Sequence, residues 1–170
     1  MKNESLVLIG MAGAGKSTLG KDLAGALGFG FVDLDDCIRE QEAQSIQSII
    51  DTRGEEALLH LEESIMSRID LKGRVIAPGG SIIYNSKLME YLKQNCFIVF
   101  LDEDFPTLVA RLGNAASRGI VGLKKKTLKE IYDERRPLYL KYADFTISTR
   151  EKSRQEIVSE IVKQFRSTGS

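Results

Sequence analysis

Short apolar runs alternate with amphipathic stretches along the whole chain. The apolar runs predict strands at 6–9, 29–33, 74–77, 97–102 and 145–148. Between them, leucine and isoleucine recur every three or four residues, which predicts helices around 19–27, 55–70, 86–94, 107–112, 127–141 and 155–165, and an interrupted helical stretch over 37–50. Alternation of this kind predicts a three-layer α/β/α fold, in which helices cover both faces of a central five-stranded parallel sheet. Ligands of such folds bind at the carboxyl ends of the strands.

A glycine-rich loop joins the first predicted strand to the first predicted helix. Residues 10–18 fit G-x-x-x-x-G-K-[ST], the phosphate-binding P-loop. Glycines let the backbone curl so that its N–H groups face phosphate oxygens, and the helix N-terminus adds its positive end. We expect the nucleotide to contact Gly13, Ala14, Gly15, Lys16, Ser17 and Thr18. Lys16 should reach the β- and γ-phosphates and Ser17 should offer its hydroxyl to Mg²⁺. The alternative is a chance glycine-rich turn before a helix, which the match to the full motif between a strand and a helix disfavours.

Acidic residues follow the second predicted strand. Alternate residues of an extended chain point the same way, so Asp33 and Asp35 are expected to share a side. Carboxylates at this edge of the sheet can hold Mg²⁺ or accept a proton. An acidic helix start capped by Asp35 or Asp36 explains the same residues equally well, so both interpretations stay open.

Two further loops follow strand ends or interrupt the pattern. The run Pro78-Gly79-Gly80-Ser81 allows a ligand to approach the backbone closely, although a plain tight turn would also use it. From Gly113 to Lys126 the helical pattern fails, and glycines bracket Arg118. A glycine-hinged loop with a central cation is typical of a lid over transferring phosphate, while the lysine run 124–126 alone is typical of a solvated helix start.

The composition excludes several classes of protein. A chain of 170 residues suits one domain, 1–170, and zero net charge gives no reason to expect a nucleic-acid or membrane partner. Cys37 and Cys96 match no metal or redox spacing and are expected to be reduced thiols. With no visible signal peptide and no long apolar run, a cytoplasmic protein is expected, and we expect a monomer.

The order of the motifs resembles the shikimate kinases, a family of P-loop enzymes. The resemblance extends nearly end to end and includes the P-loop, Phe31-Val32-Asp33-Leu34-Asp35, Gly54-Glu55-Glu56 with the later Glu62, and Glu134-Arg135-Arg136-Pro137-Leu138-Tyr139. It implies a P-loop NTPase fold with a mobile lid at about 113–126. It also implies Mg²⁺-dependent transfer of the γ-phosphoryl group of ATP to a hydroxyl of shikimate.

The resemblance assigns roles at the nucleotide. It makes Asp33 the carboxylate that holds Mg²⁺ through water, Arg118 the lid arginine that contacts phosphate, and Arg111 an arginine stacked on adenine. The apolar run 97–102 ends in Asp102 and by pattern alone looks like a Walker B strand. Because the family places its Mg²⁺ carboxylate on the second strand, we expect Asp102 to be only a strand end.

The resemblance also assigns an acceptor site. Asp35 corresponds to the carboxylate that binds the substrate hydroxyls and acts as base, with Lys16 and Arg118 as the other catalytic residues. Gly79 and Gly80 correspond to glycines that line the acceptor pocket. Arg135 corresponds to an arginine that grips the acceptor's carboxylate.

The acceptor site departs from the family pattern. Leu59 stands where the family has a second carboxylate-binding arginine, Ser81 replaces the third pocket glycine, and the lid lacks its proline at Gly119. A hydrogen bond to a charged group contributes roughly 1.5–3 kcal/mol, so losing the arginine should weaken acceptor binding by about one to two powers of ten. The adjacent His60 points about 100° away on a helix and is a poor substitute.

These departures leave three hypotheses. The acceptor is shikimate, held mainly by Arg135 and Asp35, or it is another small hydroxylated molecule in a pocket reshaped around Leu59 and Ser81. The third hypothesis is a nucleotide-binding regulatory protein without transferase activity. A GTPase switch is disfavoured because the sequence has no N-K-x-D motif. Shikimate is the leading hypothesis.

Overall fold

A parallel sheet forms the centre of the molecule. The computed structural model describes residues 4–113 and 119–169. In that part of the chain the strands are β1 (Ser5–Ile9), β2 (Gly30–Asp33), β3 (Arg74–Ala77), β4 (Phe97–Asp102) and β5 (Phe145–Ser148), in the spatial order β2-β3-β1-β4-β5. Every pairing is parallel. The predicted five-stranded parallel sheet is confirmed, and each strand begins within one residue of its expected start.

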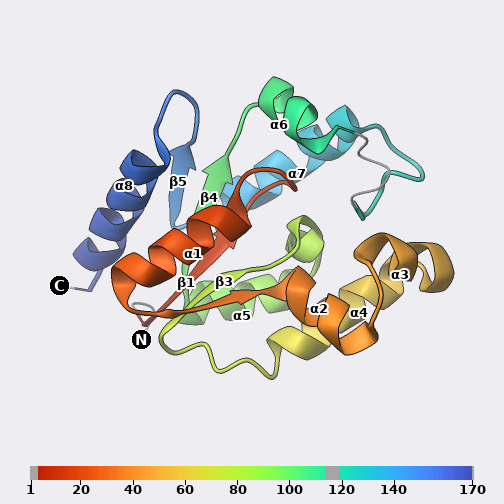
Figure 1. Ribbon diagram of the computed structural model, residues 1–170, viewed down its shortest axis with the longest axis horizontal. Coiled ribbons are helices and arrows are strands. Elements are labelled where there is room, and N and C mark those ends of the chain that lie inside the picture. The colour runs from red at the N-terminus through yellow and green to blue at the C-terminus, as the bar shows by residue number, and fades with distance from the viewer. Residues whose placement is uncertain (1–3, 114–118, 170) are drawn as a thin grey trace.

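Helices cover both faces of the sheet (Figure 1). They are α1 (Lys16–Leu27), α2 (Leu34–Glu42), α3 (Ile46–Arg53), α4 (Glu55–Met66), α5 (Ser86–Asn95), α6 (Phe105–Leu112), α7 (Leu128–Tyr142) and α8 (Arg154–Ser167), with a 3₁₀ turn, η2 (Gly80–Tyr84). Helices α1 and α8 pack together on one face, and α5 and α7 pack on the other. Helices α2, α3 and α4 pack against one another beside β2. The expected three-layer α/β/α architecture is therefore confirmed.

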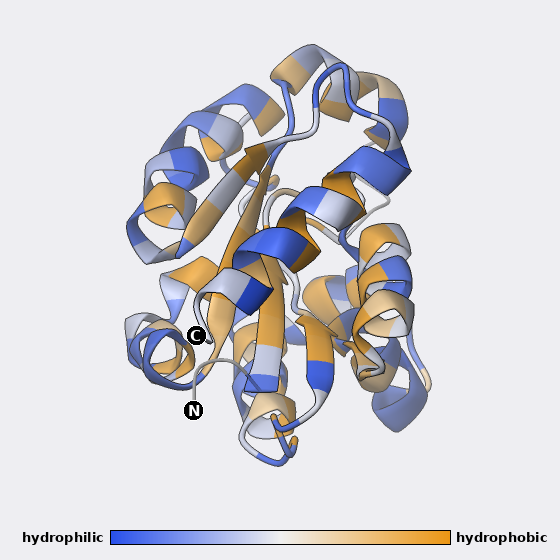
Figure 2. Ribbon diagram, turned by 90° about the vertical axis from the view of Figure 1, so that its left-hand side faces the viewer, coloured by the Kyte–Doolittle hydropathy of each residue, from blue (hydrophilic) through white to orange (hydrophobic). Residues whose placement is uncertain are grey.

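Burial on both faces explains why the strands are continuously apolar. Every residue of β1 is at most 2% exposed, and β4 is buried from Phe97 to Leu101. The strands form an orange band between helices whose outer sides are blue in Figure 2. Polar positions within the strands would have lost water without gaining partners, so such strands contain few of them. None of the helices in residues 4–113 and 119–169 is long and apolar enough to cross a membrane.

The start of α2 corrects the expectation for the acidic residues. Asp33, rather than Asp35 or Asp36, is the N-cap, and its side chain accepts hydrogen bonds from the backbone N–H groups of those two residues. Asp35 lies in the first turn of the helix, so the extended-chain reason for placing Asp33 and Asp35 on one side is wrong. The helix begins immediately after β2 because Asp33 satisfies its first free donors.

The helical stretch over 37–50 is interrupted, as expected. It is divided into α2 and α3, because Ala43 adopts a left-handed conformation (φ 53°) and Ser45 caps a new helix. One other boundary differs from the pattern, since the helix expected to reach Asp70 ends at Met66 although the apolar spacing continues.

Candidate functional site

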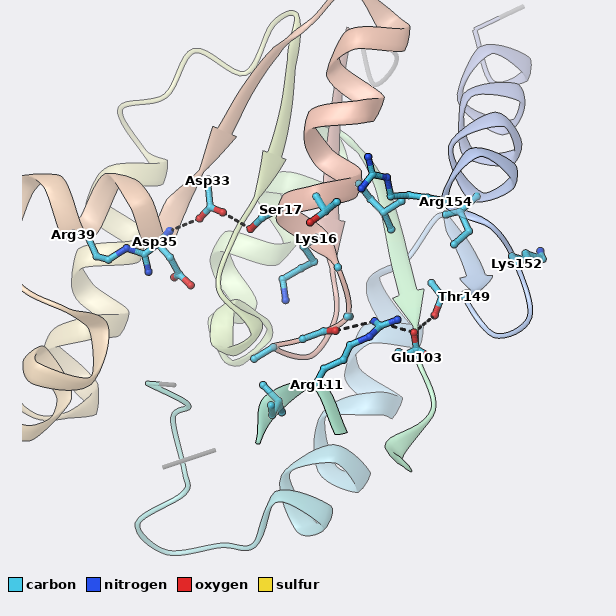
Figure 3. Close-up of a pocket in the computed structure, with 18 residues that line it drawn as sticks. Lys16, Ser17, Asp33, Asp35, Arg39, Glu103, Arg111, Thr149, Lys152 and Arg154 are labelled. Carbon is cyan, nitrogen blue, oxygen red and sulfur yellow. Dashed lines mark hydrogen bonds and ion pairs between the residues drawn. The ribbon is translucent and has the colours of Figure 1, made fainter. Parts of the chain in front are cut away.

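A cleft of about 700 Å³ opens at the carboxyl ends of the strands (Figure 3). The P-loop forms one wall, and the loops after β2, β4 and β5 complete it. The lining residues are Ala12, Gly13, Ala14, Gly15, Lys16, Ser17, Thr18, Leu19, Asp33, Asp35, Arg39, Glu103, Arg111, Leu112, Thr149, Lys152, Arg154 and Ile157. The cleft has the size of a small-molecule site and lies where the sheet topology predicts one.

The P-loop holds the Lys16 ammonium against its own backbone. Gly15 precedes α1 with φ 96°, a conformation that side chains disfavour, and this lets the loop turn into the helix. The Lys16 Nζ donates to the carbonyl oxygens of Gly10 (2.6 Å) and Met11 (2.9 Å). Burial lowers the pKa of Lys16 to about 8, and the nearby carboxylates partly oppose this. The loop thus places one cation beside a helix N-terminus, where an anion is bound favourably.

Asp33 joins the P-loop helix to α2. The Ser17 hydroxyl donates to Asp33 Oδ2, and Asp33 Oδ1 accepts from the backbone N–H groups of Asp35 (3.0 Å) and Asp36 (3.3 Å). Figure 3 shows the Asp33 carboxylate pointing toward Ser17, and the Asp35 side chain below it in this view. The arrangement presents a hydroxyl and a carboxylate, both hard oxygen ligands, at the edge of the cleft.

Asp35 lies where the large cleft meets a second, smaller cavity, because it lines both. Its pKa is raised, first by burial and then by the negative charge of Asp33, while Lys16 and Arg39 act in the opposite direction. A carboxylate with a raised pKa is a better proton acceptor than an ordinary one. Asp35 is therefore placed to serve a group that enters from either cavity.

The second cavity, of about 40 Å³, has one polar and one apolar side. It is lined by Ala12, Asp35, Ile46, Leu58, Glu62, Gly79, Gly80, Ser81, Gly119, Ile120, Val121 and Arg135. A Cβ on Gly79 would lie 2.3 Å from Glu62 Oε1, so a side chain at this position would force the Glu62 carboxyl group to shift. The expectation of close approach at the glycines after β3 thus agrees with the packing, although the approaching group is a side chain of the same chain.

Arg135 is the cation of the second cavity. It is 2% exposed, its Nη2 donates to the carbonyl oxygen of Val121 (2.7 Å), and its guanidinium lies 5.3 Å from the centre of the Tyr84 ring. The next residue, Arg136, points away and forms an ion pair with Asp102 (2.7 Å). Asp102 lines neither cavity, which agrees with its expected role as a strand end.

Leu59 and Ser81 are two residues at which the sequence differs from the family pattern near the second cavity. Ser81 lines it and donates to the buried Glu62 carboxyl. Leu58 lines the cavity, whereas Leu59, the residue expected to contact the acceptor, does not line it and is half-buried. The single histidine, His60, is exposed on α4. The wall formed by Ile46 and Leu58 is therefore apolar.

Arg111 is held over the cleft by residues that the motifs did not identify. Its Nη1 lies 3.0 Å from the carbonyl oxygen of Gly13 and 3.1 Å from Glu103 Oε2. Glu103 is 3% exposed and also accepts from the Thr149 hydroxyl (2.6 Å). The sequence could have indicated Glu103 only because an acidic residue follows a buried strand. Asp102, the residue before it, fits the same description, so the pattern does not distinguish the two.

Other residues of the cleft were also missed, and one expected residue is not among those that the structure describes. Arg39, Lys152 and Arg154 line the cleft from α2, from the loop after β5 and from the start of α8 (Figure 3). Arg118 lies outside the described residues. Among the residues that are described, no group of three or more His, Cys, Asp or Glu could hold a metal ion by itself.

Three comparisons identify similar proteins. The family model "Shikimate kinase" matches residues 12–166. The chain is 35% identical to the shikimate kinase of Persephonella marina, over 95% of this chain and 99% of that protein. It is 30% identical to the shikimate kinase of Caldanaerobacter subterraneus, over 97% of this chain and 96% of that protein.

Solved structures give the same result. The chain is similar to a shikimate kinase from Acinetobacter baumannii in complex with shikimate, with a TM-score of 0.85 and 29% identity over 97% of this chain and 94% of that one. It is also similar to the shikimate kinase from Aquifex aeolicus, with a TM-score of 0.80 and 29% identity over 97% of this chain and 98% of that one. A gluconokinase from Sinorhizobium meliloti, at 18% identity and a TM-score of 0.60 over 98% and 94%, shares the fold.

Proposed function

Because the chain belongs to the shikimate kinase family, we propose that it transfers the γ-phosphoryl group of ATP to a hydroxyl of shikimate, which yields shikimate 3-phosphate. The observation that carries the proposal is the position of Asp35. Its carboxyl lines both the large cleft beside the P-loop and the small cavity that contains Arg135. A group that binds both substrates at their junction is what a direct phosphoryl transfer requires.

The large cleft binds the nucleotide in this proposal. The P-loop from Gly13 to Thr18 surrounds the phosphates, Lys16 contacts the β- and γ-phosphates, and Arg111 packs on the base. Arg111 is supported in this role by its contacts with Gly13 and Glu103. Arg118 is proposed to contact the transferred phosphate.

Mg²⁺ is proposed to be held by the Ser17 hydroxyl and, through water, by Asp33. The residues fit this ion, because both atoms are hard oxygen donors that already lie within hydrogen-bond distance of each other. Magnesium usually keeps several waters and takes only one or two protein oxygens together with phosphates, so a larger carboxylate cluster is not required. When bound, the ion neutralises charge on the phosphate oxygens.

The small cavity binds the acceptor. Arg135 grips its carboxylate, Asp35 orients the reacting hydroxyl and accepts its proton, and Gly79, Gly80 and Ser81 form the floor. The acceptor oxygen then forms a bond to the γ-phosphorus as the bond from that phosphorus to the bridging oxygen of ADP breaks. With leucine at position 59, the acceptor meets no second guanidinium from α4.

We propose a single domain over 1–170, with residues 113–126 as a lid that excludes water from the reaction. The described part of this segment supports the assignment, because Gly119, Ile120 and Val121 already cover the small cavity. We further propose that the protein acts in the cytoplasm as a monomer.

ADP release from Mg²⁺-ATP, measured with and without shikimate, tests the function. Saturable ADP formation that depends on shikimate is the expected result. Asp35→Asn should lower turnover by about 10²–10⁴-fold, because a positioned general base contributes that much, while ATP binding stays unchanged. Asp133→Asn is the matched control, since Asp133 is an exposed aspartate of α7 that lines neither cavity and pairs with Lys129.

A kinase for a different hydroxylated acceptor is the second candidate. It is favoured by one observation, namely that Arg135 is the single guanidinium among the described residues that line the small cavity. In that case ADP formation would not respond to shikimate but would respond to another compound from a panel of hydroxylated acids and sugars. A regulatory nucleotide-binding protein would respond to none of them, and Asp35→Asn would leave its nucleotide-linked behaviour unchanged.

A further inference from the structure

The mechanism above gives no role to Glu62, a buried acid of the small cavity. This residue projects from α4, is 3% exposed and lines the small cavity together with Asp35 and Arg135. Glu62 Oε1 and Asp35 Oδ1 lie 2.3 and 3.4 Å from the point where a Cβ on Gly79 would stand. Two carboxyl groups therefore face the space that the proposed acceptor enters with a carboxylate of its own.

The partners of Glu62 are unusual for a buried acid. The Ser81 hydroxyl lies 3.3 and 3.5 Å from its two oxygens, and among the described residues no ion pair joins Glu62 to a cation. The family pattern has an arginine at Leu59, one helical turn before Glu62, and a glycine at Ser81. Compared with that pattern, Glu62 in this chain lacks the guanidinium at position 59 and has the Ser81 hydroxyl as a neighbour instead.

The surroundings favour the neutral form of Glu62. Burial and the charge of Asp35 on α2 raise its pKa to about 8, while Ser81 on η2, Arg135 on α7 and Lys16 on α1 act in the opposite direction. Below that pH the group is a carboxylic acid, which donates one O–H hydrogen bond. Above it the group is an anion that repels another carboxylate.

We propose that Glu62 determines acceptor specificity in this chain: as a neutral carboxylic acid it donates its O–H to the acceptor's carboxylate, on the opposite side from Arg135. The inference rests on the proposed function, since it needs an acceptor that carries a carboxylate. It explains how the pocket can bind such an acceptor with one guanidinium. An O–H donor to a carboxylate is a charge-assisted hydrogen bond, which is stronger than a neutral one.

Binding should therefore be coupled to a proton. At a pH near 8 about half of the free enzyme has ionised Glu62, so binding of shikimate should take up about half a proton per site. The dissociation constant for shikimate should be nearly constant below pH 7 and should rise about tenfold between pH 7 and pH 9. Calorimetry of shikimate binding to the Mg²⁺-ADP complex, in buffers of different ionisation enthalpy, measures both quantities.

The variant Glu62→Gln is the main test. A glutamine has a similar shape and always donates, so shikimate should bind this variant without taking up a proton. Its dissociation constant should change less than about twofold from pH 7 to pH 9. Glu56→Gln, on the exposed side of the same helix, should keep the wild-type profile. A Glu62→Gln protein with the wild-type pH profile would overturn the proposal.

Ser81→Ala provides a second test that leaves the acid in place. The Ser81 hydrogen bond lowers the pKa of Glu62, so its removal should move the rise of the dissociation constant to a higher pH. Tighter binding of shikimate as the pH increases would mean that ionised Glu62 accepts from a hydroxyl of the acceptor, and would refute the inference. Absence of shikimate-dependent ADP formation at every pH would instead refute the proposed function.

Discussion

Arg135 and Arg136 are adjacent residues with different environments. Arg135 is buried under the carbonyl oxygen of Val121, whereas Arg136 is partly exposed and binds Asp102 at the edge of the sheet. Successive residues of a helix differ in direction by about 100°, so α7 directs one guanidinium into the acceptor cavity and the other away from it. The pair therefore offers a test in which the control differs from the site residue only in direction.

Arg135→Lys should raise the KM for shikimate about tenfold or more, with a smaller change in the KM for ATP. Lysine keeps the charge but cannot form the two parallel hydrogen bonds by which a guanidinium recognises a carboxylate. Arg136→Lys should leave both constants within about twofold of the wild type, because surface ion pairs contribute little. Steady-state kinetics with each substrate varied in turn will show the difference. Equal effects of the two substitutions would contradict the assignment of Arg135.

Single residues also show how far the sequence could predict the site. The P-loop was found because its spacing is specific and its residues are contiguous. The role of Asp33 as the N-cap of α2 was missed, because the residue that caps a helix depends on where the strand ends. Glu103 was missed because its function comes from contact with Arg111 and Thr149, which come later in the chain. The orientation of Glu62 into the cavity required the packing of α4 on η2.

Helix α8 contributes Arg154 and Ile157 to the cleft and also supports the element that carries the P-loop. It packs against α1 and β5, and α1 carries the P-loop at its N-terminus. At its own start the Ser153 side chain accepts from the Glu156 N–H (3.1 Å), and Glu156 accepts from the Ser153 N–H (2.6 Å). This capping box satisfies two donors that would otherwise be free at the helix end.

Ser153→Ala should lower the free energy of unfolding by about 1 kcal/mol, because it removes an N-cap side chain. For a chain of this size the midpoint of thermal unfolding should fall by about 2–4 °C. Ser159→Ala is the matched control, since Ser159 is an exposed residue in the middle of the same helix, where alanine is at least as favourable. Urea unfolding of the three proteins measures the difference, and a loss of similar size in both variants would exclude the capping box as its cause.

At the scale of the whole molecule, the sheet order brings the two cavities together. β1 lies in the centre and carries the P-loop, β3 on one side carries Gly79 and Gly80, and β4 on the other side leads to Glu103. The small cavity is thus on the β3 side, and the end of the large cleft that contains Arg111 is on the β4 side. A nucleotide bound across this arrangement contacts both halves of the sheet, so its binding energy should stabilise the complete fold.

Mg²⁺-ADP at about 100 times its dissociation constant should stabilise the folded protein by about 2.7 kcal/mol and raise the unfolding midpoint by about 5–10 °C. Lys16→Ala should remove most of that increase, because the ammonium no longer contacts the phosphates. Lys21→Ala should keep it, because Lys21 is exposed further along α1. Thermal unfolding followed by circular dichroism measures the midpoint, and an increase that survives Lys16→Ala would contradict the nucleotide site.

The contact between Arg135 and the Val121 carbonyl should weaken the measured affinity of this protein for its acceptor. The Val121 carbonyl oxygen already accepts a hydrogen bond from the Arg135 guanidinium that the proposed acceptor needs. The remaining cavity of about 40 Å³ is far smaller than ordinary ligand pockets. An acceptor therefore competes with an internal ligand, and its apparent dissociation constant is the intrinsic one divided by the fraction of molecules in which residues 119–122 have moved aside. A substitution that loosens this segment, such as one at Gln47, would make the acceptor bind more tightly without adding any contact to it.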